Sequence, residues 1–117
     1  MNGLIELEEM SFYAYHGCFK EEQVVGNKFT VNIAFTTNCK VAAASDHLSD
    51  AVNYVQIYNI TKHEIAIKSH LLEHVGARIV NAIVAEFPQI SSLKVKISKL
   101  NPPVGGQMKQ VSVTLTT

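Results

Sequence analysis

The sequence predicts an α+β fold in which two helices pack as a layer on one face of a four-stranded antiparallel sheet. Two observations support this fold class. Apolar and polar residues alternate within 5–36 and again within 93–116, which is the period of half-buried strands. Between these runs, apolar residues from 50 to 87 recur at every third or fourth position, which is the period of amphipathic helices. Strands on both sides of a helical block favour one antiparallel sheet with the helices on one face.

Each strand is expected where the alternation is regular. Residues 5–8 predict a short first strand, and the aromatic segment 12–15 that follows is β-prone. The strictest alternation runs through 29–36. Two further alternating segments, 93–98 and 111–116, follow the helices and complete the sheet.

Two helices and two connections account for the rest of the chain. Residues 17–27 are expected to form a loop, and 42–49 a connector with a short helical turn. The first helix is expected to begin with Asp50 as its N-cap, and its stripe consists of Tyr54, Ile57, Tyr58, Thr61 and Ile65. The second helix is expected to follow Ser69 and to end at Pro88, and its stripe consists of Leu72, Val75, Ile79, Ile83 and Phe87.

Composition indicates a single domain, residues 1–117, and restricts its partners. Ten basic and ten acidic residues cancel, so no overall field attracts nucleic acid or anionic lipid. No apolar run approaches the ~18 residues of a membrane helix, and no signal-peptide pattern is visible at the start. Cys18 and Cys39 match no disulfide framework or paired metal motif, so two reduced thiols in a cytoplasmic protein are expected.

Lys99 stands out by its position directly after the alternating segment 93–98. It shares the parity of the apolar residues in 93–98, and Pro102 ends the strand soon after because proline donates no ladder hydrogen bond. An ammonium group on the apolar face loses hydration, which disfavours its charged form and suits a general base. Parity alone also allows a second interpretation, in which Lys99 extends into solvent at the strand end.

Glu73 lies in the first turn of the second expected helix. The helix dipole favours a carboxylate there, which explains Glu73 without any ligand. It is one residue out of register for a capping box with Ser69, so its oxygens are free to accept other hydrogen bonds. The paired N–H groups of a guanidine-like heterocycle are candidate donors. The residue pattern leaves both interpretations open.

The histidines do not predict a metal site. His70 and His74 are four residues apart on one helix, but no third ligand is spaced to join them. His63 and Glu64 begin like the zinc-binding helix of a protease, whereas Ile67 occupies the place of the second histidine. Neither a metal nor a cofactor is expected.

Five short motifs together resemble the dihydroneopterin aldolase family. In chain order they are Phe12-Tyr-Ala-Tyr-His-Gly17, Glu22 with Gly26, Val52-Asn-Tyr54, Leu71-Leu-Glu73-His, and Lys99-Leu-Asn-Pro-Pro103. Their order and spacing match the family over essentially the whole chain. No single motif is decisive, but the five together are specific.

The resemblance implies an assembly and a reaction. The family adopts the tunnelling fold, in which four-stranded sheets from several subunits close into a β-barrel, so a homo-oligomer is expected, either a tetramer or a homo-octamer. Its members are lyases of tetrahydrofolate biosynthesis that cleave dihydroneopterin to hydroxymethyl-dihydropterin and glycolaldehyde. Many also epimerise the side chain of this pterin substrate. The reaction requires no Schiff base, metal or cofactor, because the imine of the pterin takes up the electrons.

The resemblance also implies roles for particular residues. The catalytic residues would be Lys99 as base, Glu22 near the side-chain hydroxyls of the substrate, and Tyr54 from the neighbouring subunit as proton donor. The substrate-binding residues would be Glu73, which anchors the pterin ring, and Leu71, Leu72, Val52 and Cys18. Taken without the resemblance, Tyr54 is expected in the core and Glu22 in a solvated acidic pair.

Two departures from the family pattern and two rival functions accompany this interpretation. After Pro103 the family usually continues Ile-Pro-Gly-His, whereas Val104-Gly-Gly-Gln107 stands here, and His70 replaces a frequent asparagine. One rival is dihydroneopterin triphosphate epimerase, which the presence of a single arginine, Arg78, disfavours. The other is a non-catalytic pterin- or purine-binding oligomer.

Overall fold

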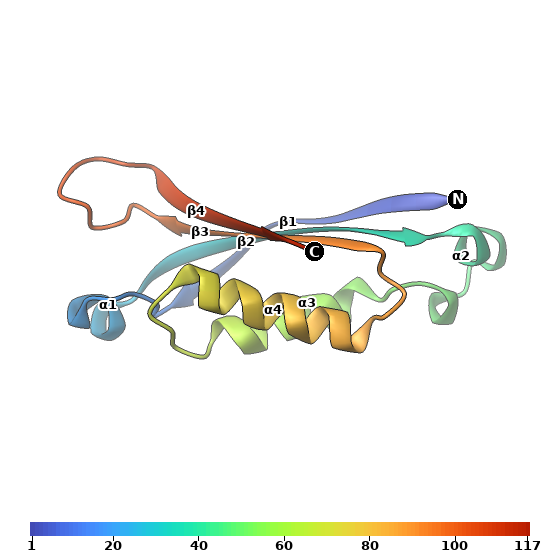
Figure 1. The fold of residues 1–117 in the computed structure, drawn as a ribbon, viewed down its shortest axis with the longest axis horizontal. Helices are drawn as coiled ribbons and strands as arrows, with labels where there is room; N and C mark the ends of the chain where they lie inside the picture. The colour runs from blue at the N-terminus through green and yellow to red at the C-terminus, as the bar shows by residue number, and fades with distance from the viewer.

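The computed structural model describes all 117 residues and contains one four-stranded sheet with helices on one side (Figure 1). In chain order the elements are β1 (Asn2–Ala14), α1 (Lys20–Val25), β2 (Asn27–Asn38), α2 (Lys40–Ser45), a 3-10 turn η1 (Leu48–Asp50), α3 (Tyr54–Ile65), α4 (Leu72–Glu86), β3 (Ser92–Leu100) and β4 (Gln110–Thr116).

Every strand pair is antiparallel, and the order across the sheet is β1-β2-β3-β4. Helices α3 and α4 pack together against one face, and the opposite face is left open (Figure 1). A single apolar cluster between the sheet and these helices forms the core, with most of its residues in β2, β3 and α4. The predicted α+β layer is therefore confirmed. Within this single chain the sheet is open, with β1 and β4 as its edges.

A β-bulge joins the two expected N-terminal segments into the single strand β1. The register with β2 shifts between Leu7 and Met10, and Glu9 has a positive φ of 56°. Asn32 holds the bulge, because its Oδ1 accepts a hydrogen bond from the Glu9 N–H at 2.8 Å. The extra residue reverses the alternation, so that Leu7 before it and Met10 after it both face the helices.

Two local expectations were wrong. Residues 17–27 contain the short helix α1 rather than only a loop. Asn53, not Asp50, is the N-cap of α3, and its side chain accepts a hydrogen bond from the Val55 N–H at 3.0 Å. Asp50 ends η1 and accepts a hydrogen bond from the Ser45 hydroxyl instead. Aspartate and asparagine both cap helices well, and here the turn η1 takes up Asp50 and leaves Asn53 to begin α3.

Candidate active site

Lys99 lies on the helix-covered face of the sheet. In the ladder it stands opposite Phe29, a fully buried core residue, and its Nζ lies 5.8 Å from the centre of the Phe29 ring. Its side chain is 12% exposed, and Nζ donates a hydrogen bond to Oε1 of Glu22 at 3.0 Å. The expectation from strand parity is confirmed, and the alternative in which Lys99 extends into solvent is wrong.

The Glu22 side chain is held against Lys99 by the start of α1. Its Oε2 accepts a hydrogen bond from the Phe19 N–H at 3.1 Å, and the Glu22 N–H donates to the Phe19 carbonyl at 3.1 Å. The backbone thus fixes one carboxylate oxygen while the other faces Lys99. Gly17 makes room for this arrangement, because a Cβ at that position would overlap the Glu22 carboxylate. Glu22 is therefore not the solvated acidic residue that its local sequence suggested.

The surroundings of Glu22 favour its ionised form. Burial raises the pKa of this carboxyl, but the hydrogen bond and charge of Lys99 oppose burial, as do the N–H groups of Phe19 and Cys18. The lowering contributions prevail, and the pKa of Glu22 lies below its usual 4.5. At neutral pH Glu22 is therefore a carboxylate that can hold both Lys99 and a polar reactant.

His16 is a fully buried side chain next to this pair. Its ring packs edge-on against Phe29, with the ring centres 5.2 Å apart. Nδ1 accepts a hydrogen bond from the Ser69 N–H at 3.1 Å, whereas Nε2 has no partner in hydrogen-bonding geometry. Because Nδ1 must be an acceptor here, the imidazole is neutral with its proton on Nε2.

Burial is the main reason why the pKa of His16 lies below its usual 6.5. The positive charges of Arg78 and Lys99 lower the pKa further. The nearby Ile65 carbonyl raises the pKa, but Nε2 makes no hydrogen bond of good geometry, so this effect only partly offsets burial and the two positive charges. The neutral ring is thus the stable form beside Lys99.

Glu73 occupies the second position of α4 and is exposed. It forms no hydrogen bond and no ion pair with any other side chain of this chain. Leu71 is the N-cap of α4 and half exposed, while Leu72 is buried. The Glu73 carboxylate is therefore available to a ligand at the start of α4, where the helix dipole favours a negative charge.

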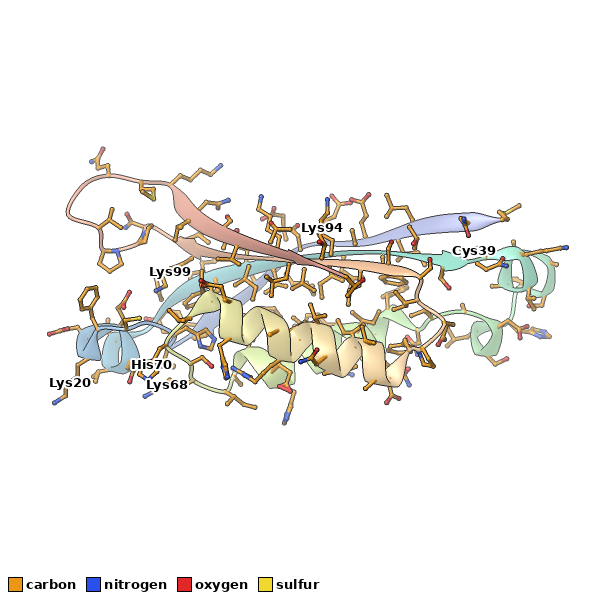
Figure 2. The ribbon with its side chains drawn as sticks, in the orientation of Figure 1. Lys20, Cys39, Lys68, His70, Lys94 and Lys99 are labelled. Carbon is orange, nitrogen blue, oxygen red and sulfur yellow. The ribbon has the colours of Figure 1, made fainter.

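Cys18 lies where the connection before α4 meets the connection before α1. Its thiol donates to the His70 carbonyl at 3.6 Å. Figure 2 shows His70 and Lys99 at the end of the molecule where α1 lies. Cys18, Glu22, Lys99 and the start of α4 thus belong to one end of the molecule.

Tyr54 and Val52 lie far from this end. Tyr54 is the first residue of α3, and Ile65, near His16, is the last. At about 1.5 Å per residue the helix separates them by roughly 16 Å. Val52 lines a cavity with Cys39, which Figure 2 shows at the opposite end of the molecule. The structure of one chain therefore does not bring Tyr54 or Val52 to Lys99. The expectation that Tyr54 is a core residue is wrong, because its side chain is 62% exposed.

The two histidines on α4 and before it are engaged in separate hydrogen bonds. Nδ1 of His70 lies 3.0 Å from Nε2 of Gln23, and Nδ1 of His74 lies 3.0 Å from the Ser69 hydroxyl. No three His, Cys, Asp or Glu side chains lie close enough together to hold a metal ion. None of the helices is long and apolar enough to cross a membrane.

Sequence reasoning missed the supporting roles of His16, Gly17 and Ser69. In the sequence, His16 and Gly17 stand out only as part of a motif, and Ser69 only as a helix boundary and as a capping-box residue out of register with Glu73. A signal for His16 was present, because it continues the two-residue alternation of Phe12 and Ala14, which face the helices. No local signal distinguishes Ser69 from any other serine before a helix.

A family model described as dihydroneopterin aldolase matches residues 5–116. The chain belongs to the dihydroneopterin aldolase family. It is 38% identical over 112 residues to dihydroneopterin aldolase of Streptococcus pyogenes serotype M6, which covers 95% of this chain and 94% of that relative. It is 34% identical over 116 residues to the enzyme of Staphylococcus epidermidis, with 98% and 96% covered. As a member of this family it is an aldolase of folate biosynthesis, an enzyme of the lyase class.

Solved structures of the family share its fold. Escherichia coli dihydroneopterin aldolase in complex with neopterin has a TM-score of 0.90 at 22% identity, covering 98% of both chains. A Burkholderia dihydroneopterin aldolase bound to guanine has a TM-score of 0.80 at 14% identity, covering 99% of this chain and 90% of that chain. The tunnelling-fold subunit expected from the motifs is therefore the observed one.

Proposed function

We propose that this chain cleaves dihydroneopterin to hydroxymethyl-dihydropterin and glycolaldehyde, with Lys99 and Glu22 at the reacting side chain and Glu73 at the ring. The observation that carries this proposal is the Lys99–Glu22 pair, held at 3.0 Å on the apolar face of the sheet. The unpartnered carboxylate of Glu73 belongs to the same end of the molecule. A polar reacting pair and a separate ring anchor are what retro-aldol cleavage of a pterin requires.

Glu73 is suited to the polar edge of the ring. Neopterin and guanine, the ligands of the two solved relatives, both carry an amino group next to an amide N–H. Two parallel N–H donors match the two oxygens of one carboxylate. In this proposal backbone groups of Leu71 and Leu72 complete the ring edge, and Cys18 contacts the ring from the α1 side.

The proposed cleavage is a proton transfer coupled to carbon–carbon bond breaking. Lys99 acts here as a neutral amine and, through a water molecule that Glu22 helps to hold, removes the proton from the hydroxyl on the outer carbon of the scissile bond. That carbon becomes the aldehyde of glycolaldehyde, and the bonding electrons pass to the imine of the ring. The inner carbon then takes a proton from Tyr54 and becomes the hydroxymethyl carbon, and the proton that Lys99 removed returns to Tyr54 through water. No bond to the lysine forms.

Tyr54 reaches this site in the proposal only from a neighbouring subunit. Its side chain is exposed, and its own chain holds it roughly 16 Å from Ile65 along α3. The subunit is elongated, 53 × 24 × 20 Å, and β1 and β4 are unpaired edges. Pairing edges between copies would close the sheets into a barrel, as a tetramer or as two stacked rings forming an octamer. Val52 would enter the site with Tyr54.

The structure also bears on the triphosphate epimerase alternative. Arg78, the only arginine, is committed to Glu64, Ile67 and Ser69 and is not free to bind a triphosphate. Cleavage is therefore the main activity in this proposal, with epimerisation of the side chain as a secondary one. The two free cysteines fit a reducing compartment, which makes the cytoplasm the proposed location.

Release of glycolaldehyde from dihydroneopterin tests the proposed function. The wild-type chain is expected to release it, and Lys99→Ala is expected to lower the rate by ~10² or more while neopterin still binds. Lys94→Ala is the matched control, because Lys94 is an exposed lysine of the same strand on the open face (Figure 2). Near-wild-type cleavage by Lys99→Ala would exclude Lys99 as the base.

A further inference from the structure

Ser69 uses every hydrogen-bonding group it has, although it lies between α3 and α4 and in no helix or strand. Its N–H donates to Nδ1 of His16 at 3.1 Å, and its carbonyl accepts from the Gly17 N–H at 3.1 Å. Its hydroxyl lies 2.9 Å from Nη2 of Arg78 and 3.0 Å from Nδ1 of His74. Since arginine can only donate, the hydroxyl accepts from Arg78 and is free to donate to His74. Ser69 is also buried.

Arg78 extends this network to the end of α3. Its Nη1 donates to the carbonyl of Glu64 at 2.7 Å and to the Glu64 carboxylate at 3.3 Å. Its Nη2 donates to the Ile67 carbonyl at 2.8 Å as well as to Ser69. The planar guanidinium of Arg78, a residue of α4, thus binds the segment that connects α3 to α4 and holds it against α4. A lysine carries the same charge but cannot reproduce the fork of donors.

The bonds of Ser69 lead to both halves of the proposed site. His16 and Gly17 directly precede the segment that carries Glu22, and Gly17 is the residue on which the Glu22 carboxylate packs. On the other side, Ser69 precedes Glu73 by four residues. The other hydrogen bonds between these two segments, from Cys18 and Gln23 to His70, are exposed. Ser69 is therefore their buried junction.

We propose that Ser69 is a positioning residue, which sets the separation between the Lys99–Glu22 pair and the Glu73 carboxylate. A substrate held by its ring then presents its side chain to the reacting pair. This inference rests on the proposed function, because it concerns the geometry of the same site. A misplacement of ~1 Å can lower a rate by ~10²-fold, whereas binding at the anchor tolerates it.

Removal of the Ser69 hydroxyl tests the inference. Ser69→Ala leaves the backbone bonds in place and deletes those to Arg78 and His74. The expected result is a fall in kcat for dihydroneopterin cleavage of roughly tenfold or more, with the Kd for neopterin changed less than about threefold. Ser69→Thr, which retains the hydroxyl, should restore most of kcat. Arg78→Lys, which keeps the charge but loses the fork, should lower kcat in the same way as Ser69→Ala.

Thr61→Val is the matched control. Thr61 is a fully buried residue of α3 whose hydroxyl donates to the Ile57 carbonyl at 2.8 Å, so this variant also loses one buried hydroxyl bond. It should lower the unfolding temperature but leave kcat unchanged.

The inference is overturned if kcat per folded Ser69→Ala protein equals that of the wild type. It is also overturned if kcat and neopterin affinity fall together, or if Thr61→Val lowers kcat as much. A wild-type chain that binds neopterin without cleaving dihydroneopterin overturns the proposed function, and this inference with it.

Discussion

Glu22 and Lys99 form an ion pair whose two side chains are 15% and 12% exposed. Partial burial makes such a pair a poor source of stability, because the loss of hydration offsets much of the attraction. The pair is nevertheless supported by backbone N–H groups on the Glu22 side and by the Phe29 ring on the Lys99 side. A pair that adds little net stability and is still held in place by its neighbours fits a reacting group better than a structural one.

Removal of the Glu73 carboxylate should weaken binding of the pterin ring. A charged two-point contact in a closed pocket contributes roughly 2–4 kcal/mol, so Glu73→Ala should raise the Kd for neopterin by well over tenfold. A fluorescence titration measures this. Glu86→Ala, which removes an exposed carboxylate from the other end of α4, should bind neopterin normally. Unchanged affinity of Glu73→Ala would place the anchor elsewhere.

Protonation of His16 should destabilise the fold at acid pH. Its pKa is lowered in the folded state, so the unfolded chain binds the proton more tightly. The free energy of unfolding should therefore fall as the pH drops below about 6.5, by up to about 1.4 kcal/mol per pH unit, until the folded-state pKa is reached. The lowered pKa of Glu22 acts with the same sign below 4.5.

The variant His16→Asn separates the His16 contribution from that of other groups. Asparagine offers an acceptor for the Ser69 N–H but does not titrate. Urea unfolding of both proteins between pH 7.5 and 5 should show a smaller pH dependence in the variant, although the variant is less stable throughout. Equal slopes in the two proteins would mean that another group is responsible.

At the scale of elements, α1 shows how backbone space positions a side chain. It has only six residues and no buried residue of its own, so no hydrophobic stripe reveals it in the sequence. The glycines on either side of α1 leave the space that this helix needs. A Cβ at Gly17 would overlap Glu22, and Gly26, with a φ of 77°, lies against the Tyr13 and Tyr15 rings. The turn geometry, rather than helix propensity, places Glu22 at Lys99.

Substitution of Gly17 should therefore affect catalysis more than folding. Gly17→Ala forces the Glu22 carboxylate away from its position, so the rate of cleavage should fall by roughly tenfold or more. Gly106→Ala is the control, because a Cβ there meets no atom within 4 Å and the backbone has no positive φ. Steady-state cleavage by the two variants, compared with their unfolding temperatures, measures the effect. Equal rates in both would show that Glu22 can move without cost.

At the scale of the whole molecule, the single chain is more extended than a compact domain. Its radius of gyration is 15.7 Å, whereas a compact domain of this length has about 13.4 Å. One sheet face is open, and Tyr54 is exposed at the start of α3, roughly 16 Å along the helix from Ile65. These features fit an assembly in which each site combines residues of two chains.

Mixed assemblies test whether the site is shared between subunits. Tyr54→Phe and Lys99→Ala should each be poorly active alone. When the two are unfolded together and refolded as mixed oligomers, some interfaces pair an intact Tyr54 with an intact Lys99, and activity should partly return. Tyr58→Phe, on the same helix, is the control and should be active by itself. Mixed oligomers without recovered activity would exclude a shared site.

The amino-acid sequence by itself determined the α+β class, the four strands, the two long helices and the parity that places Lys99 on the apolar face. These follow from hydrophobic periodicity, because a whole strand or helix must turn one face to the core. Tertiary structure decided the N-cap of α3, the bulge that joins β1, the helix α1 and the junction at Ser69. Each of these depends on which groups from distant parts of the chain come together. A hydrogen bond between residues 16 and 69, for example, leaves no periodic pattern in the sequence around either residue. The contact of Lys99 with Glu22, 77 residues apart, is of the same kind.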